Sequence, residues 1–432
     1  MSALAGTRVI ELSHERTAWA GKLLADMGAD VVLVEPPGGD ATRAWPPFAG
    51  DVPGPERSLH WWHHQTSKRG IALDLDDARG RDVLRRLVSG ADVLLEGEPP
   101  GRLGAQGLDH ADLAALRPEL VMASITPFGR EGPRRDEPAT DLTLLAAAGP
   151  VWSCGYDDHA LPPVRGLGGQ AAHIGGHYAV LAVLTALLHR AASGEGQHVD
   201  VSLYAAANVT TEMASYHWLV QRTTVQRQTG RHAMEFQTLP TQIRCADGRH
   251  VCTGVPPRRR AEFARLVAWL ESLGIDELAF PELVFLRRGA ERDVDFAQIG
   301  VDDEVTAIFA AAREAMNLAA SRLPAHEFFL GAQRNAGIPV GVIHSPEEAF
   351  EDEHFRARGF QVEVAHPELG RSVRYPGAPW RFEKTPWRIS RRAPRLGEHT
   401  EEVLSAAGIA REEIAALRAA GVLGRAAPEA GA

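Results

Sequence analysis

The sequence predicts an α/β protein built on an open, mostly parallel sheet, and two features of its first 130 residues support that class. Short apolar strands alternate with helical segments, and the strands lack a clean alternation of apolar and polar residues. Strands of this kind are buried on both faces, as in parallel sheets that helices cover on each side. The strands expected in this region span residues 7–12, 30–35, 71–75, 92–96 and 120–125.

Helical segments connect these strands in the order that a parallel sheet needs. They are expected at residues 22–27, 78–88 and 111–116, and Gly28 closes the first of them. A strand, a helix and a parallel strand form the unit from which open α/β sheets are built. In such sheets ligands bind in the loops at the carboxyl ends of the strands, so we expect the functional loops at that edge.

A glycine-rich loop that opens a long apolar segment is the most informative stretch of the chain. Gly166, Gly168 and Gly169 precede an apolar run at 178–188 that contains no proline and is too long for an ordinary strand, so it predicts a buried helix. Free N–H groups at a helix start favour an anion or a polarised oxygen, because the helix dipole points the same way. The residues at this start, Ala171 to His173, include no carboxylate, Ser or Cys.

The middle of the chain predicts a second, smaller α+β domain. We expect a large domain from residues 1–222, a small domain from 223–330, and a return to the large domain with C-terminal helices in 331–432. The further elements expected are a strand at 198–203, a helix at 204–220, two strands within 236–255, helices at 260–273 and 301–323, a strand at 337–343 and a helix at 398–417.

Composition indicates the cellular compartment and excludes some classes of partner. The net charge is -10 and no basic run interrupts it, so a general nucleic-acid surface is not expected. The three cysteines are odd in number and widely spaced, which is typical of a reducing compartment. Apolar runs stay short of the roughly 20 residues that a membrane helix needs. We therefore expect a cytoplasmic protein with no membrane span.

Two motifs near the glycine-rich loop have ordinary interpretations. Gly166-x-Gly168-x-x-Ala171 matches a dinucleotide fingerprint, but no strand precedes it and no acid follows at the usual distance, so a tight turn is favoured. His173 and His177 share a helix face without a third ligand, and we expect no metal there. His173 is instead a candidate general base. The cluster of His60, His63 and His64 around two tryptophans is interpreted as packed or surface histidines.

Eight stretches taken in order resemble one known family. They are LAGTRVIELS, LLADMGADVVLVEPPGGDATR, SKRGIALDLDDARG, ADVLLEGEPPG, GLDHADLAALRPELV, SITPFGREGP, LLHRAASGEGQHVDVSL and PRLGEHTEEVL. This series is similar to the family III CoA-transferases, the group of formyl-CoA transferase, carnitine CoA-transferase and α-methylacyl-CoA racemase. The resemblance implies a large Rossmann-like domain from both chain ends, a smaller middle domain, an interlocked dimer and acyl-CoA, hence coenzyme A, as substrate.

The resemblance also places the family's reactive residue. In the family's transferases an aspartate at the start of the central helix attacks the acyl-CoA thioester, giving an anhydride and then an aspartyl-CoA thioester. That position is Ala172 here, and a methyl group cannot form an anhydride. Polar or basic residues of other members are also replaced, by Pro36, Gly97, Ala105 and Pro138. The chemical positions are altered together while the motifs of the scaffold are intact.

Several residues remain as candidates for contact with CoA under this resemblance. They are Arg16, Lys68, Arg69, Leu73 and Gly97, with Arg102, Arg134 and Arg135 as further basic neighbours. Charge-assisted hydrogen bonds from Arg and Lys are the usual means of holding phosphate groups.

Three interpretations of the function remain open. The first is a subunit without its own aspartate nucleophile, paired with an active homologue in a heteromer. The second is a stand-alone acyl-CoA enzyme, a lyase, isomerase or transferase, that uses His173 or a carboxylate from Glu15, Asp141 or Glu235. The third is a non-enzymatic protein that binds acyl-CoA or another ligand. The expected assembly is a homodimer or a heterodimer with a related family III chain.

Overall fold

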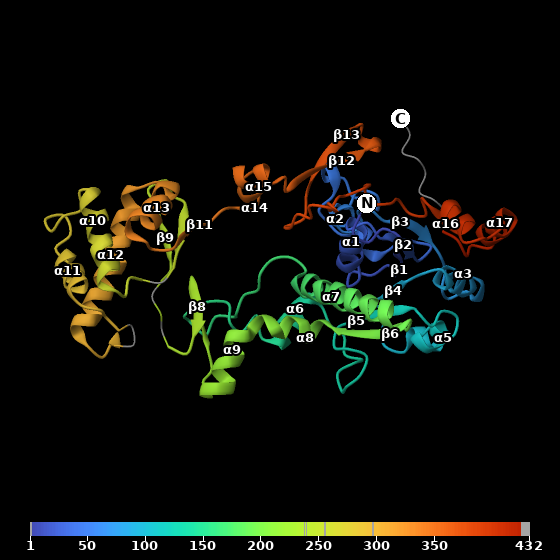
Figure 1. Cartoon of the computed structure of the whole chain (residues 1–432), viewed down its shortest axis with the longest axis horizontal. Coiled ribbons are helices and arrows are strands. Elements are labelled where there is room, and N and C mark those ends of the chain that lie inside the picture. The colour runs from blue at the N-terminus through green and yellow to red at the C-terminus, as the bar shows by residue number, and fades with distance from the viewer. Residues whose placement is uncertain (1, 237, 239, 255, 296–297, 425–432) are drawn as a thin grey trace. The chain divides into compact units, whose positions relative to one another are not determined.

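The computed structural model describes residues 2–236, 238, 240–254, 256–295 and 298–424, and Figure 1 shows the order of their elements. The chain separates into two compact units. The first holds residues up to Val151, then Arg165–Ser215, then residues from Asp352 on. The second holds Trp152–Val164 and Tyr216–Glu351.

The first unit is built on a sheet of six parallel strands in the order β3-β2-β1-β4-β5-β6. These strands are β1 Arg8–Leu12, β2 Asp30–Glu35, β3 Arg69–Ala72, β4 Val93–Glu96, β5 Val121–Thr126 and β6 Gln197–Ser202. The α/β class and the parallel sheet expected from the sequence are therefore confirmed. This order reverses direction between β1 and β4, as in Rossmann folds, and leaves β6 at one edge of the sheet.

Helices cover both faces of this sheet. The main ones are α1 Ala18–Asp26, α3 Ala78–Ser89, α5 His110–Ala114, α6 Asp141–Ala148, α7 Gln170–Ser193, α16 Thr400–Ala406 and α17 Arg411–Ala419. On one face, Val9 and Leu95 pack with side chains of α1, α6 and α7. On the other face, Ile10 and Leu94 pack with α3, α16 and α17. Alternate residues of one strand thus serve two cores, which explains the unbroken apolar runs in the sequence.

The remaining elements of the first unit are short. They are the 3-10 turns Ala41–Ala44, Ala49–Asp51, Val209–Thr211 and Pro367–Leu369, and α2 Leu59–His64, α4 Arg102–Ala105, α8 Leu203–Asn208, α9 Glu212–Tyr216, α15 Glu353–Arg358, β12 Gln361–His366 and β13 Arg371–Pro376. The hairpin β12–β13 packs on α2, where Trp61 and Trp62 lie against Val364 and Tyr375. A hairpin from the C-terminal third of the chain thereby covers α2, which belongs to the N-terminal part.

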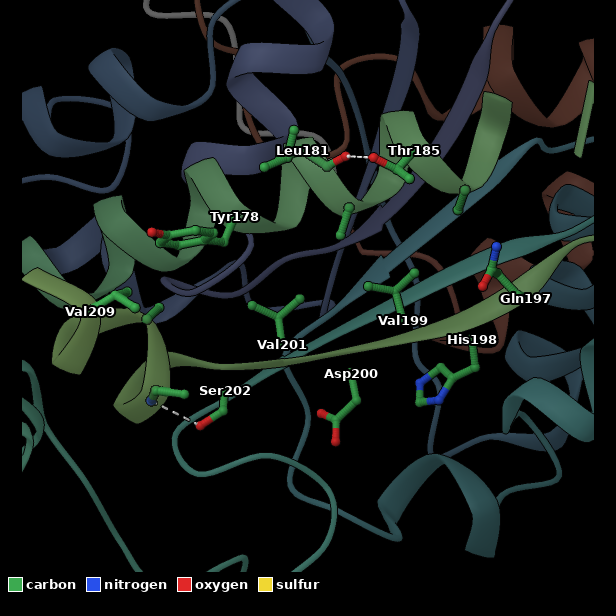
Figure 2. A pocket seen from close by; sticks show the side chains of 14 residues that line it. Tyr178, Leu181, Thr185, Gln197, His198, Val199, Asp200, Val201, Ser202 and Val209 are labelled. Atoms are coloured by element: carbon green, nitrogen blue, oxygen red, sulfur yellow. Dashed lines mark hydrogen bonds between the residues drawn. The ribbon is translucent and has the colours of Figure 1, made fainter. Parts of the chain in front are cut away.

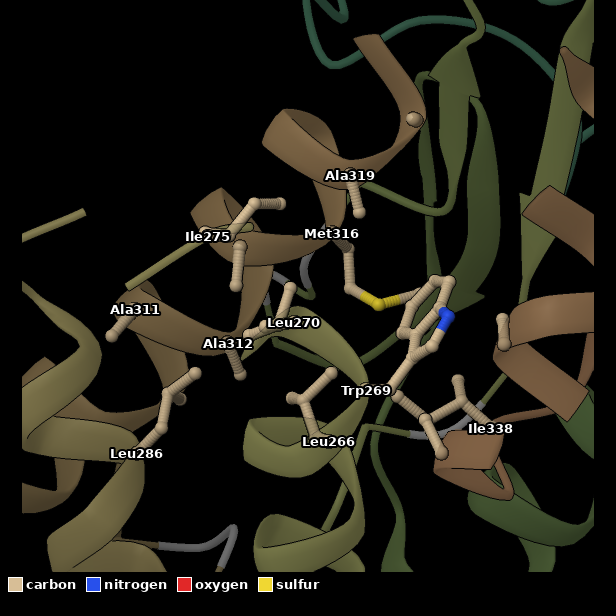
Figure 3. Packing of buried hydrophobic residues seen from close by; sticks show 14 of the residues in the cluster. Leu266, Trp269, Leu270, Ile275, Leu286, Ala311, Ala312, Met316, Ala319 and Ile338 are labelled. Atoms are coloured by element: carbon tan, nitrogen blue, oxygen red, sulfur yellow. The ribbon is translucent and has the colours of Figure 1, made fainter. Parts of the chain in front are cut away.

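The second unit pairs a small sheet with helices. Its elements are β7 Gln226–Gln228, β8 Arg231–Met234, β9 Gln242–Arg244, β10 His250–Thr253, α10 Arg260–Ser272, α11 Leu283–Glu291, α12 Asp303–Arg322, α13 Ala325–Gly331, β11 Val340–Val342, α14 Pro346–Phe350 and π-helical turns at His217–Gln221 and Ala332–Ala336. Its core gathers large side chains from α10, α11, α12 and α13, including Trp269 and Met316 (Figure 3).

Three elements differ from the sequence expectations. The strand expected in 337–343 to mark the return to the large domain forms as β11, but its main chain bonds to β10, so the chain rejoins the first unit only at Asp352. The helix expected at 204–220 is broken into α8, a 3-10 turn, α9 and a π-helical turn. The segment 222–234, for which no strand was expected, forms the pair β7–β8 around Gly230, whose positive φ of 64° suits the turn.

Helix α7 has the length and apolar composition of a membrane span, and among the described residues no other helix does. In the structure it lies along β5 and β6 and against α1 (Figure 1). Gly175 and Gly176 allow that close packing, because a side chain at either position would collide with Leu203 or Trp19. The helix therefore serves the core of the first unit. A cytoplasmic location stays a prediction.

Candidate functional site

The candidate site is the first turn of α7 together with the loops that surround it. Gly169 is the N-cap residue of this helix and uses no side chain to cap it. Instead, the main-chain N–H of Ala171 donates a hydrogen bond of 2.7 Å to Oδ1 of Asp141, the first residue of α6. Ala172 is partly buried and follows directly. A carboxylate thus lies at the start of α7, although it belongs to another helix.

Arg165 links Asp141 to the glycine-rich loop. Its Nη1 lies 3.0 Å from Oδ2 of Asp141 and also donates to the carbonyl oxygens of Gly166 at 3.1 Å and Gly168 at 3.0 Å. A capping box between Thr140 and Thr143 fixes the start of α6. The loop, α6 and α7 are therefore joined by one cation and one anion.

The loops after β1 and β4 form a second part of the site. These neighbouring strands flank the point where the strand order reverses, which is where open α/β sheets bind ligands. Nη1 of Arg16 donates to the carbonyl oxygen of Gly97 at 2.7 Å. Gly97 is buried, and an added Cβ would come within 3.1 Å of the His14 side chain. The structure thus brings together Arg16 and Gly97, two of the predicted CoA contacts.

Burial decides the ionisation of the groups in this loop. It raises the pKa of Glu15, Arg16 lowers it, and Asp40 and Asp141 raise it further. Burial lowers the pKa of His14 to about 4, with help from the positive charge of Arg16. Glu15 and Asp141 are close enough to repel each other as anions. Two of the three carboxylates considered from the sequence therefore belong to this region.

Glu235, the third of those carboxylates, lies in the second unit, where Oε2 is 3.5 Å from Nδ1 of His217.

A cluster of aromatic rings borders the first turn of α7. Its members come from α1, α2 and α7 and the loop after β2, and they are Trp19, Trp45, His60, His63, His64, His173 and His177. The ring centroids of Trp19 and His173 are 4.2 Å apart, as are those of His60 and His64. Burial lowers the pKa of His173, and lowers that of His63 to about 3. Lowered pKa values leave the rings of His173 and His63 uncharged at neutral pH.

Lys68, a predicted CoA contact, has a different environment from the one expected. The side chain is fully buried, and Nζ lies 2.8 Å from Oε2 of Glu11 and donates to Oε1 of Gln65 at 2.6 Å. Every donor is directed at the interior, so a bond to a CoA phosphate would require breaking this network. Position in the sequence gave no signal of this burial, because Glu11 and Lys68 are distant along the chain.

The other basic candidates are also engaged. Arg69 pairs with Asp30 at 2.7 Å and with Glu402 at 2.8 Å, while Leu73 is buried. The neighbours Arg102, Arg134 and Arg135 pair with nearby carboxylates, and Arg134 also covers the ring of Phe128. Arg69 and Leu73 belong to β3 or its end, whereas Arg16 and Gly97 follow β1 and β4. The predicted set is thus divided between two places.

No group of three or more His, Cys, Asp or Glu side chains within the described part of the chain has the geometry of a metal site.

A groove of about 650 Å³ lies between α7 and the edge strand β6 (Figure 2). Its lining comes from α7, β6 and α8 and is mostly apolar, with Val199 and Val201 pointing toward the helix and His198 and Asp200 pointing away. None of the predicted site residues lines it.

Three contributors escaped the sequence reasoning. Arg165 and Trp19 lie in stretches that were expected to be loops without a motif, and His64 was interpreted as a packed or surface histidine. The run of histidines and tryptophans at 60–64 was the available signal, but the sequence could not show that it faces α7.

The sheet order and the glycine-rich helix start define a Rossmann-type α/β protein with its ligand loops at the switch point. The sequence profile of CoA-transferase family III matches residues 4–400, and the chain belongs to this family. The recognition made from the sequence motifs is therefore confirmed.

Relatives with established names extend over nearly the whole chain. The sequence is 32% identical to the succinyl-CoA:(R)-benzylsuccinate CoA-transferase subunit BbsE of Thauera aromatica, covering 94% of this chain and 95% of that one. It is 33% identical to a succinate–glutarate CoA-transferase of Agrobacterium fabrum (93% and 95%), and 30% identical to the succinyl-CoA–L-malate CoA-transferase beta subunit of Chloroflexus aurantiacus (97% and 98%). A CAIB/BAIF family protein from Brucella suis superimposes with a TM-score of 0.76 at 26% identity, covering 94% and 99%.

Proposed function

We propose that this chain is one subunit of a heteromeric CoA-transferase that moves CoA between an acyl-CoA and a carboxylic acid, with the reactive aspartate supplied by a related partner chain. The observation that carries this proposal is the first turn of α7, where Gln170, Ala171, Ala172 and His173 offer no carboxylate. The named relatives include subunits of transferases for benzylsuccinate and for L-malate, which supports a paired assembly and a dicarboxylic acceptor.

The acid-free turn still carries the features that bind an acyl-CoA. Main-chain N–H groups open α7, and the helix dipole favours a polarised thioester oxygen there. Arg16 and the loop of Gly97 lie at the switch point, where a nucleotide is expected. The chain would thus keep its binding elements and its fold while its partner performs the covalent step.

Exposed apolar surface on the first unit supports a partner chain. Along α7, Leu181 is 62% exposed and Leu188 is 74% exposed, and the groove beside β6 continues this surface. Among the described residues β6 pairs only with β5, and an open strand edge beside an exposed apolar helix face offers a template for an interface. We assign this surface to a related family III chain, since the alpha and beta subunits of the L-malate CoA-transferase are both similar to this chain.

Purification tests the proposal directly. The chain isolated alone is expected to transfer no CoA from succinyl-CoA to glutarate or L-malate, and the chain from its native host is expected to co-purify with a related chain that has Asp at the position of Ala172. Transfer by the lone chain at a rate comparable with the assembled enzyme would overturn the proposal.

A second candidate function is favoured by one contact. Because Asp141 places its carboxylate at the start of α7, the chain alone would use Asp141 as the acyl acceptor. The carboxylate is bound by Ala171 N–H and by Arg165, which orients it but also lowers its reactivity as an anion. An active lone chain that loses its activity in Asp141→Asn would establish this candidate, whereas an active Asp141→Asn protein would exclude it.

A further inference from the structure

A chain of hydrogen bonds from α2 to α7 fixes where the protons of two histidines lie. Nδ1 of His64 is 2.9 Å from the carbonyl oxygen of His60. A carbonyl oxygen only accepts, so Nδ1 of His64 must carry the proton. Burial lowers the pKa of His64 well below its usual value, so this ring is neutral and its Nε2 is bare.

The bare nitrogen of His64 determines the form of His173. The two Nε2 atoms are 3.4 Å apart, and a hydrogen bond between them requires a proton on one. Since Nε2 of His64 has none, Nε2 of His173 is the donor. Burial also lowers the pKa of His173, and the ring is neutral. The remaining nitrogen, Nδ1 of His173, is therefore a bare acceptor in the first turn of α7.

Neighbouring rings hold His173 in this orientation. The Trp19 ring packs against it with centroids 4.2 Å apart, and Nε1 of Trp19 donates to Nε2 of His177, one helical turn further along α7. The charged groups that act on the cluster are Lys22, which disfavours protonation of His63, and Asp40, which favours protonation of His60. The ring is thus fixed by contacts from α1 and α2 and not by its own helix.

We propose that His64 is a positioning residue that holds His173 as a neutral imidazole with Nδ1 as an acceptor for an N–H or O–H donor of the bound CoA thioester. This ligand rests on the proposed function, whereas the positioning itself does not. The donor is an amide N–H of the pantetheine arm or a hydroxyl of the acyl group. The first turn of α7 then presents main-chain donors to the thioester oxygen and one acceptor to the rest of the ligand.

A neutral His173 with a bare Nδ1 disfavours a carboxylate of the ligand beside it. A protonated His173 would attract a carboxylate, whereas a bare Nδ1 repels one. A dicarboxylic acyl group would therefore direct its distal carboxylate away from His173.

The tautomers can be read from nitrogen NMR of the full-length chain labelled with 15N-histidine at neutral pH. His64 is expected in the Nδ1–H form and His173 in the Nε2–H form. His64→Gln retains an acceptor and should keep His173 in a single form, whereas His64→Phe should give exchange between forms and a changed titration of His173. The exposed His354, replaced by Gln, assigns one signal and should change nothing else. An Nε2–H form of His64, or His173 unaltered by His64→Phe, would overturn the positioning role.

Calorimetry on His173→Phe identifies the donor. Loss of one hydrogen bond should weaken binding by about 2- to 10-fold. If the donor is an amide, the loss appears with CoA itself; if it is an acyl hydroxyl, it appears with malyl-CoA and not with succinyl-CoA. Equal affinities of wild type and variant for all three would refute the ligand contact. The NMR test of the tautomers does not depend on CoA transfer. A failure of the proposed function can therefore be told apart from a failure of the positioning role.

Discussion

Asp141 accepts a hydrogen bond of 2.7 Å from the main-chain N–H of Ala171. The helix that opens the candidate site is thus capped by a carboxylate thirty positions earlier in the chain, and the same carboxylate pairs with Arg165 at 3.0 Å. An anion at a helix N-terminus is stabilised by the free N–H groups and the dipole. One N–H group at the start of α7 is therefore already satisfied by a carboxylate, although α7 contributes no acid of its own.

Asp141→Asn should lower the free energy of unfolding by about 1 kcal/mol. Asn keeps an oxygen for Ala171 N–H but loses the charge that favours the helix start and pairs with Arg165. The midpoint of urea denaturation measures the change. Asp136→Asn is the matched control, because Asp136 is 69% exposed and pairs only with its neighbour Arg135 among the contacts described, so it should change stability by less than about 0.5 kcal/mol. Equal effects of the two variants would contradict the capping role.

Ala172→Asp should restore the covalent step in the lone chain. The side chain is partly buried in the first turn of α7, where an acid is favoured by the dipole. On incubation with succinyl-CoA, mass spectrometry should detect CoA attached to this variant as an aspartyl thioester. Ala172→Asn has the same size without a carboxylate and should carry no adduct. If Ala172→Asp folds and binds CoA yet forms no adduct, the assignment of the family's reactive position to Ala172 is wrong.

The sequence revealed the strands of the large sheet because burial on both faces leaves a local pattern. The β1 and β2 segments were predicted almost to the residue, as was the α3 helix between β3 and β4. Contacts across the fold left no such pattern. No residue near Asp141 in the sequence indicates that it bonds to Ala171. Lys68 was expected to bind a phosphate, because its ion pair with the distant Glu11 leaves no local pattern. The sequence showed that residue 172 is not an acid and offered Asp141 as a candidate carboxylate, but it could not show that Asp141 accepts a hydrogen bond from Ala171 at the start of α7.

Lys68→Met should destabilise the protein by about 3–5 kcal/mol, because it leaves the fully buried Glu11 without its counter-charge. Adding Glu11→Gln should recover much of that loss, since the double variant buries no lone charge. Denaturant titration of the three proteins measures the coupling. Binding of CoA to the folded double variant distinguishes this role from the phosphate contact expected from the sequence: an affinity within about twofold of wild type fits the interior role, and a loss above about tenfold fits a phosphate contact.

The histidines beside α7 should make the protein less stable as the pH falls. Burial lowers the pKa of His63 to about 3, whereas an unfolded histidine titrates near its usual value of 6.5. Between these two pKa values His63 binds a proton in the unfolded chain but not in the folded chain. The free energy of unfolding is therefore highest above about pH 6.5 and declines below it. At pH 5 this histidine lowers the free energy of unfolding by about 2 kcal/mol relative to neutral pH. His64, whose pKa is also lowered by burial, adds a loss of the same sign.

Comparison of variants isolates this effect from other buried groups. Burial raises the pKa of Glu11, Asp26 and Glu35, and these carboxyls oppose the trend because the folded state holds their protons more tightly. Their contribution cancels when wild type and His63→Phe are compared at each pH. The stability of His63→Phe relative to wild type should therefore rise by about 2 kcal/mol between pH 7.5 and pH 5. The same comparison with His354→Gln, an exposed site, should stay constant, and a constant difference for His63→Phe as well would show that the ring accepts a proton in the folded protein.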